Sequence, residues 1–191
     1  MELDALIERL SSFDEAGCEA EAVMLGQQGV VGLALLAELL NRPEADMRFW
    51  AVRGLWSSGS AEAVTLLVET LYDPEEMVRS GAALALGEMR AEAAVTVLAD
   101  LLTTDPSACG SHAADALAKI GPAATPRLIE AMQHEATRVR VRAAKALLPI
   151  ESKAAIPALF KALEDDSYVV REYAAEGLIR LGVGQMVYFQ V

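Results

Sequence analysis

The sequence predicts an all-α, right-handed solenoid of about five helical hairpins, with one further helix capping the N-terminal end. Three apolar positions recur together along most of the chain, with successive copies 30 or 31 residues apart. The first is held by Met47, Val78, Cys109, Val139 and Val170, the second by Ala51, Ala82, Ala113, Ala143 and Ala174, and the third by Leu55, Leu86, Leu117, Leu147 and Leu178. Three positions that repeat in one register are typical of a solenoid.

Each repeat is expected to contain two helices. Val78, Ala82 and Leu86 follow the spacing i, i+4, i+8, which places them on one helix face, and the central alanine allows a neighbouring helix to approach closely. Gly87, or Ser57-Ser58-Gly59 in the preceding repeat, is predicted to end this first helix. A second apolar pattern then begins at Val95. One hairpin cannot bury both of its faces, so successive hairpins are expected to stack and share a core.

The chain is interpreted as one repeat domain over residues 1–191. Residues 1–14 form the N-terminal cap helix, residues 19–182 the repeats and residues 183–191 a C-terminal tail. The opening repeat is degenerate, with helices at Glu19 to Leu25 and Val30 to Leu40, as expected where one face meets water. The later repeats are predicted at Asp46 to Tyr72, Glu75 to Thr103, Ser107 to His134 and Thr137 to Glu164. A last first helix, Tyr168 to Leu181, has no second helix after it.

The C-terminal tail, Val187-Tyr188-Phe189-Gln190-Val191, is apolar. Three interpretations stay open: a lid folded over the last helix, a dimer contact, or a vector-derived remnant. The uncovered last helix and the apolar tail together predict a homodimer that forms through the C-terminal end.

Composition excludes several classes of protein. Apolar residues make up 53% of the chain but aromatic residues only 5%, so the core must consist of Ala, Leu and Val, which suits helices. The net charge is -12, so nucleic acid is not expected as a partner. Cys18 and Cys109 lie in separate repeats without metal-ligand spacing, which favours a reducing, cytoplasmic location. The most apolar stretch, Gly29 to Leu40, is shorter than the ~20 residues that cross a bilayer, so no membrane association is expected.

The repeats resemble the short HEAT-like repeats first described in phycobilin lyases, the PBS-lyase type. The resemblance covers about Glu19 to Gly182. The residues that carry it are Val78-Arg79, Ala82-Ala83, Ala85-Leu86-Gly87 and the run Ala155-Ile156-Pro157-Ala158-Leu159. It implies a curved rod with first helices on the convex side and second helices on the concave side.

The resemblance also implies a ladder of ion pairs, in which an aspartate between repeats pairs with an arginine six residues later. Asp73 with Arg79 and Asp165 with Arg171 have this spacing. The ladder is expected to be broken elsewhere, because Arg48 follows Arg42 and Arg140 follows His134 at the same distance. Gly110 replaces the arginine altogether in one repeat.

The concave face is predicted to bind a partner. Aligning the second helices on Val64, Val95, Pro126 and Pro157 leaves side chains for this face that are acidic at one end and mixed in charge at the other. The candidate residues are Thr65, Val68, Glu69, Tyr72, Thr96, Asp100, Thr103, Arg127, Glu130, His134, Lys161 and Asp165. A partner with a basic, partly apolar patch would fit this surface.

Other groupings have plainer explanations. Glu130 and His134 share a helix face and would bind a metal ion only with Asp165 as a third ligand. Cys109 and His112 have the spacing of a nucleophile and base, but Cys109 holds a position filled by valine in other repeats. The cluster Arg138, Arg140, Arg142 and Lys145 is either structural or a docking site for an acidic partner.

No catalytic, cofactor-binding or metal-binding residue is therefore assigned. Two functions are predicted as alternatives. The first is a non-enzymatic scaffold that binds another protein through the concave face. The second, which the resemblance alone implies, is a bilin-lyase-like or phycobilisome-associated protein that binds a phycobiliprotein or an open-chain tetrapyrrole.

Overall fold

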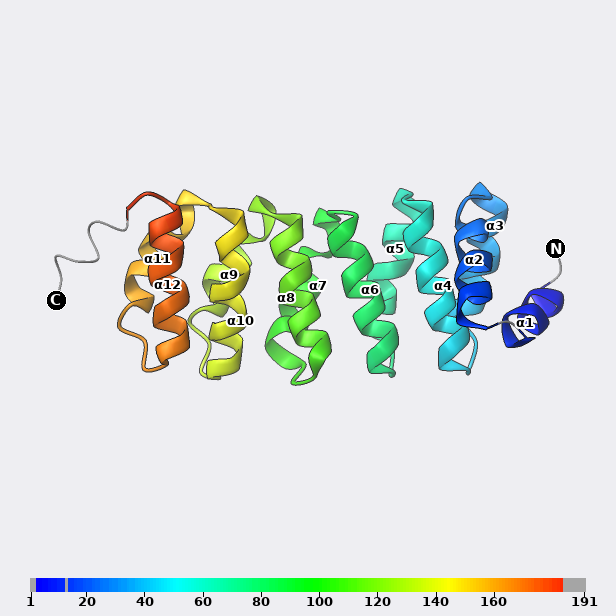
Figure 1. Ribbon diagram of the computed structural model, residues 1–191, viewed down its shortest axis with the longest axis horizontal. Helices are drawn as coiled ribbons and strands as arrows, with labels where there is room; N and C mark the ends of the chain where they lie inside the picture. Colours follow the sequence, from blue (N-terminus) through cyan, green and yellow to red (C-terminus); the bar gives the residue numbers. More distant parts are fainter. Residues whose placement is uncertain (1–2, 13, 184–191) are drawn as a thin grey trace. The chain divides into compact units, whose positions relative to one another are not determined.

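The computed structural model describes residues 3–12 and 14–183, and it is an all-α solenoid without strands in these ranges (Figure 1). The chain divides into two compact units, residues 1–89 and 90–191, and each is described by itself. The prediction of a single domain over the whole chain therefore stays a prediction.

The first unit contains six α-helices in its described residues. They are α1 (Leu3–Ser12), α2 (Glu15–Gly26), α3 (Gly29–Leu40), α4 (Ala45–Ser58), α5 (Ala61–Thr70) and α6 (Glu76–Glu88). Helices α2, α4 and α6 pack side by side as first helices, whereas α3 and α5 form a second layer (Figure 1). Helix α1 contacts α2. The first unit thus has the predicted cap helix followed by stacked hairpins.

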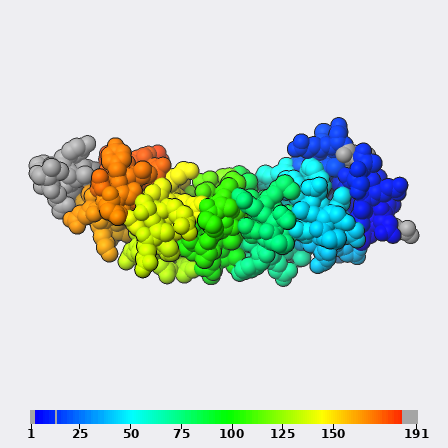
Figure 2. Space-filling model, turned by 90° about the horizontal axis from the view of Figure 1, so that it is seen from below, coloured from blue at the N-terminus to red at the C-terminus, as the bar shows by residue number. Residues whose placement is uncertain are grey.

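The second unit repeats the same arrangement. Its elements are η1 (Glu92–Ala94), α7 (Val95–Thr104), α8 (Ala108–Ile120), η2 (Pro122–Ala124), α9 (Thr125–Ala131), α10 (Thr137–Leu147), η3 (Leu148–Ile150), η4 (Lys153–Ala155), α11 (Ile156–Ala162) and α12 (Tyr168–Arg180). First helices α8, α10 and α12 form one layer, and second helices α7 and α9 pack together in the other with η4 and α11. Within each unit the repeats follow one another in sequence order (Figure 2).

The core includes the three predicted apolar positions and one recurring position on the second helices. All fifteen residues named for the first helices are buried, and none is more than 7% exposed. On the second helices a buried leucine recurs at one position, held by Leu67, Leu98, Leu128 and Leu159. Because alanine holds the middle position on every first helix, adjacent helices approach closely and little aromatic volume is needed.

The turn that ends each first helix recurs with the period. Residues with positive φ lie at Gly59 (62°), Arg90 (50°), Gly121 (90°), Glu151 (50°) and Gly182 (76°). The prediction that Gly59 ends a helix is confirmed, because it is the left-handed C-cap of α4. The prediction for Gly87 was wrong: this glycine is buried inside α6, and the chain turns three residues later.

The register predicted for the second helices was wrong by one residue in the last two repeats. Leu117 and Leu128 are 11 residues apart, whereas Leu86 and Leu98 are 12 apart, so the connection between α8 and α9 is one residue shorter. Thr125 and Ile156, rather than the prolines that follow them, therefore correspond to Val95. The prolines lie in the first turn of α9 and α11, where a missing N–H costs nothing.

Helix α12 ends the described part of the chain, close to its predicted bounds. Its inward residues Val170, Ala174 and Leu178 are buried, while Ile179 is exposed. The predictions about the apolar tail fall on residues 187–191, which lie outside the described residues. No helix within residues 3–12 and 14–183 is long and apolar enough to span a bilayer.

Candidate partner-binding site

The second helices of the second unit present a regular set of exposed side chains. Asp100, Glu130 and Lys161 each lie two residues after a buried leucine of α7, α9 or α11. A separation of two residues turns a helical side chain by about 200°, so these three side chains point away from the core. The repeat therefore places one charged, exposed side chain on each second helix.

Two depressions lie along these helices. One, of about 460 Å³, is lined by Ala99, Asp100, Thr103, Arg127, Glu130, Ala131, Gln133 and His134 of α7, α9 and the turn after α9. The other, of about 560 Å³, is lined by Met132, Gln133, His134, Glu135, Arg140, Ala158, Lys161, Ala162, Glu164, Asp165 and Asp166. Gln133 and His134 line both, so the two depressions adjoin one another.

Acidic groups outnumber basic groups around these depressions. Six carboxylates and three cationic side chains line them. Arg127 joins two of the carboxylates, because Nη2 contacts Asp100 at 2.9 Å and Nη1 contacts Glu130 at 3.0 Å. Glu135 and Glu164 are exposed. The surface between the second helices is therefore acidic and open to solvent.

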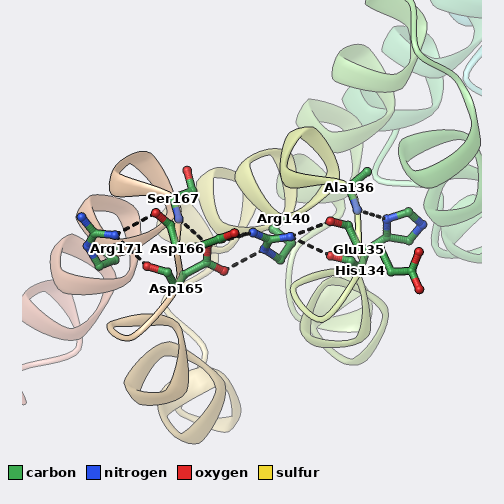
Figure 3. Close-up of polar contacts among 8 residues, drawn as sticks. All are labelled: His134, Glu135, Ala136, Arg140, Asp165, Asp166, Ser167 and Arg171. Atoms are coloured by element: carbon green, nitrogen blue, oxygen red, sulfur yellow. Dashed lines mark hydrogen bonds and ion pairs between the residues drawn. The ribbon is translucent and has the colours of Figure 1, made fainter.

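An ion pair between repeats forms one wall of the larger depression (Figure 3). Arg140 of α10 donates from Nε to Asp165 Oδ2 at 2.7 Å and from Nη2 to Oδ1 at 2.9 Å. Nη1 of the same arginine donates to the carbonyls of His134 and Glu135 at 3.0 and 2.9 Å. Both ionic side chains are only 11% exposed. The bidentate contact with Arg140 lowers the pKa of Asp165 to about 2.

The first unit contains the equivalent ion pair. Arg48 contacts Asp73 through Nε and Nη2 at 2.7 and 2.9 Å, and its Nη1 donates to the carbonyls of Arg42 and Pro43. Burial raises the pKa of Asp73, but the hydrogen bonds from Arg48 and from the Glu75 N–H outweigh it and leave the pKa lowered.

The partners in the predicted ladder were wrong. The arginine six residues after each aspartate contacts the backbone instead, since Arg79 Nη1 donates to the Asp73 carbonyl at 2.8 Å and Arg171 Nη1 to the Asp165 carbonyl at 2.7 Å. The carboxylate of each aspartate accepts from the arginine 25 residues earlier. These contacts with the preceding turn need only backbone carbonyls. Arg48 therefore makes them too, although the residue six positions before it is Arg42 and not an aspartate.

Arg142 replaces the arginine that Gly110 lacks, which sequence reasoning missed. From α10 it reaches the turn before α8 and donates to the carbonyls of Asp105 and Ser107 at 2.8 Å each, and to that of Leu102 at 3.3 Å. A Cβ on Gly110 would lie 2.3 Å from Arg142 Nη1. Burial and the nearby Arg138 lower the pKa of Arg142. The only signal in the sequence was an arginine where two earlier repeats have Gly81 and His112.

The structure brings most of the predicted binding residues of the second unit together. Asp100, Thr103, Arg127, Glu130, His134, Lys161 and Asp165 line the two depressions. In the first unit, a depression of about 220 Å³ is lined by Glu69 and the exposed Tyr72, among others. Thr65 and Thr96 are exposed and Val68 is half-buried. The role of all twelve residues in binding stays a prediction.

The prediction that the Asp165 carboxylate is available to a partner needs correction. Its carboxylate is held by Arg140, so it forms part of the wall instead of being offered to a partner. The reason is its register, because Asp165 corresponds to Asp73 in the turn between repeats and not to a second-helix position.

The two alternative chemical sites receive no support. Among the described residues, no three His, Cys, Asp or Glu side chains are placed to hold a metal ion, and Arg140 occupies the carboxylate of Asp165. The Cys109 side chain is fully buried at the position that valine holds in other repeats, so it is not accessible as a nucleophile.

The predicted basic cluster of Arg138, Arg140, Arg142 and Lys145 does not form one patch of free cations. Arg140 and Arg142 hold turns, and Lys145 contacts Asp115 at 3.3 Å.

The HEAT repeats family matches residues 33–109 and 110–179, which is more than half of the chain. The chain belongs to the HEAT repeat family. Among solved structures, this HEAT repeat protein is similar to an archaeal HEAT-like repeats protein from Thermococcus onnurineus NA1, with a TM-score of 0.65 and 17% identity, covering 95% of this chain and 80% of the other.

Two further similarities concern proteins solved as complexes. One is the complex of CpcE and CpcF of phycocyanin lyase from Nostoc sp. PCC7120, with a TM-score of 0.55 and 23% identity over 95% of this chain and 77% of the other. The other is a designed armadillo repeat protein in complex with the peptide (KR)4, with a TM-score of 0.56 and 20% identity over 95% and 100%. A comparison with curated proteins found no match. These similarities show the fold of this HEAT repeat protein.

Proposed function

We propose that this protein is a non-enzymatic scaffold that binds a basic segment of another protein along its second helices. The observation that carries the proposal is the pair of adjoining, carboxylate-lined depressions on α7, α9 and α11. Helical repeat proteins commonly bind partners along such surfaces. A cytoplasmic location, which the free cysteines favour, belongs to the same proposal.

Charge complementarity supports a basic partner. Glu130, Glu135 and Glu164 are exposed, so they can meet arginine or lysine side chains without a large cost of desolvation. The designed armadillo protein in complex with (KR)4 has a similar fold, which makes this peptide a suitable first probe.

Binding of fluorescently labelled (KR)4 peptide, followed by anisotropy at low salt, tests the proposal. The double variant Glu130→Lys/Glu164→Lys should bind at least about tenfold more weakly, because two attractive contacts become repulsive. Glu172→Lys/Glu176→Lys on α12 is the matched control, since it makes the same change of charge on a first helix. An equal loss in both double variants would show only non-specific attraction and would contradict the proposal.

A bilin-handling function is the second candidate, favoured by the similarity to the phycocyanin lyase complex. Mixing the purified protein with phycocyanobilin tests it, because a bound bilin shifts its visible absorption band. If no shift occurs and no pigment is transferred to a phycobiliprotein, this candidate is excluded.

Homodimerisation through the C-terminal end is a separate part of the proposal. The exposed Ile179 on α12 supports it, because its equivalent Leu148 is buried in the preceding repeat. Light scattering should give a dimer mass that falls to that of a monomer when Val187 to Val191 are deleted. A monomer mass for the intact chain would contradict it.

A further inference from the structure

His134 occupies the position that aspartate holds in three other turns between repeats, at Asp73, Asp105 and Asp165. Like Asp73 and Asp165, it lies six residues before an arginine of the next first helix. Its Nδ1 accepts a hydrogen bond from the Ala136 N–H at 3.0 Å. The aspartates Asp73, Asp105 and Asp165 accept the corresponding backbone N–H with a carboxylate oxygen, at 2.8, 2.8 and 2.9 Å. The histidine therefore replaces a permanent acceptor with one that protonation removes.

The arginine that would face this position is also missing. Arg48 and Arg140 each bind the aspartate that follows in the next turn, whereas the corresponding residue before His134 is Gly110. Both members of the ion pair are thus replaced in the same repeat. Without an arginine to hold it, the side chain of His134 is exposed between the two depressions.

The charged surroundings of His134 come from every element that lines the depressions with it. They are Asp100 on α7, Arg127 and Glu130 on α9, Glu135 in the turn, Arg140 on α10, Lys161 on α11, and Glu164, Asp165 and Asp166 in the turn before α12. Arg127 and Arg140 neutralise part of this negative charge through their ion pairs. Histidine is the side chain in this set whose charge changes between about pH 5 and 8.

We propose that His134 makes binding of a cationic protein segment to these depressions dependent on protonation. The inference rests on the function proposed above and adds regulation to the same site. The neutral imidazole keeps its hydrogen bond to the Ala136 N–H and leaves the surface acidic. Protonation removes the acceptor at Nδ1 and adds a positive charge where both depressions meet. A cationic segment then encounters repulsion at the centre of its binding surface.

The expected effect is a loss of affinity as the pH falls. One added charge within several ångströms of a bound arginine or lysine, at a partly solvated surface, weakens binding by about five- to tenfold. Aspartate and glutamate ordinarily change charge below about pH 5, and lysine and arginine above about pH 10. The change between about pH 8 and pH 5.5 therefore isolates the histidines.

The experiment compares labelled (KR)4 binding at about pH 8 and pH 5.5 at constant ionic strength. The native protein should bind about five- to tenfold more weakly at the lower pH. His134→Asn, which retains an acceptor for Ala136 and cannot gain a charge, should lose this dependence. His112→Asn is the matched control, because the chain has only two histidines and His112 does not line either depression. It should keep the dependence of the native protein.

Each outcome separates this inference from the proposed function. Binding that weakens equally in native protein and His134→Asn would overturn the inference and leave the scaffold function standing. An absence of binding at both pH values would overturn both. A second measurement needs no peptide: the amide ¹⁵N–¹H signal of Ala136 should shift with the titration of His134 and stay fixed in His134→Asn. A signal that does not move in the native protein would also overturn the inference.

Discussion

The two successive repeats α8–α9 and α10–α11 have the same buried frame but different means of holding the turns beside them. Arg140 of α10 holds the turn before its own helix and also binds Asp165 in the following turn. The α8–α9 repeat has Gly110 and His134 at the corresponding positions. Its preceding turn is held by Arg142, which reaches back from the next repeat.

This difference separates two roles that the arginine combines elsewhere. One role is to donate to the carbonyls of the turn, which a guanidinium from a neighbouring repeat can also do. The other is to bind the carboxylate in the next turn. In the α8–α9 repeat that carboxylate is replaced by His134, whose Nδ1 accepts a hydrogen bond from the Ala136 N–H. The turn before α8 is thus still held, by Arg142. The missing ion pair leaves the His134 side chain exposed at the candidate site.

The largest expected effect comes from breaking the complete ion pair. Arg140→Met should lower the free energy of unfolding by about 3 kcal/mol, because it leaves the largely buried carboxylate of Asp165 without its partner and two carbonyls without a donor. Urea denaturation measures the change. Arg138→Met, at an exposed position two residues earlier, should change stability by less than about 0.5 kcal/mol. Similar losses in both variants would mean that the pair contributes little.

The replacement arginine should show a smaller but coupled effect. Arg142→Ser should cost about 2 kcal/mol, because three carbonyls lose a charged donor. Gly110→Ala should cost about 2 kcal/mol, since its Cβ would lie 2.3 Å from Arg142 Nη1 and 2.4 Å from the Asp105 carbonyl oxygen.

The double variant Gly110→Ala/Arg142→Ser tests whether one residue explains the other. Removing the guanidinium relieves one of the two close contacts of the new Cβ, so the combined loss should be about 1 kcal/mol smaller than the sum of the single losses. Urea denaturation of all four proteins gives this coupling. Lys145→Ser is a suitable control for loss of a cation from α10, because its contact with Asp115 is exposed. Strict additivity in the double variant would contradict the account of Gly110.

The period of the sequence was sufficient to predict the fold, but not the contacts between repeats. Repeated Ala and Leu positions decide which helix faces are buried, so the hairpins follow from them. The contacts of Arg142 could not be predicted, because they are made with backbone carbonyls, which every residue supplies. The register of α9 and α11 was missed because the deletion lies in the connection after Gly121, where Pro126 offered a misleading match to Val95.

The candidate site was predicted only in outline. Exposed positions such as Asp100 and Glu130 follow from helical periodicity once a buried leucine is fixed. Whether a carboxylate is free or held by an arginine depends on side chains 25 residues apart, as Asp165 shows. Charge at the site is therefore a property of the stacked repeats and cannot be read from one helix.

The dependence of the free energy of unfolding on pH, at acid pH, tests the ion pair between Arg140 and Asp165 without changing its geometry. The pKa of Asp165 is about 2 in the folded protein and ordinarily near 3.9 in an unfolded chain, so its contribution is present above about pH 5 and is lost as the pH falls toward 2. Asp165→Asn should cost about 2 kcal/mol at pH 7 and almost nothing near pH 2. Asp166→Asn, which removes a carboxylate that is 86% exposed, should cost less than about 0.5 kcal/mol at either pH. A loss in Asp165→Asn that does not depend on pH would contradict the assignment.

The smallest expected effect concerns another departure of the α8–α9 repeat from its neighbours. Thr125 is 3% exposed, and its Oγ1 is buried without a hydrogen-bond partner among the described residues. The equivalent residues Val95 and Ile156 are apolar. Thr125→Val keeps the shape of the side chain and removes the unsatisfied hydroxyl, so it should raise the free energy of unfolding by about 1 kcal/mol. The exposed Thr96→Val should have no comparable effect in the same urea titration. A loss of stability in Thr125→Val would show that the hydroxyl has a hydrogen-bond partner, such as a water molecule. The threonine would then stabilise the repeat instead of weakening its core.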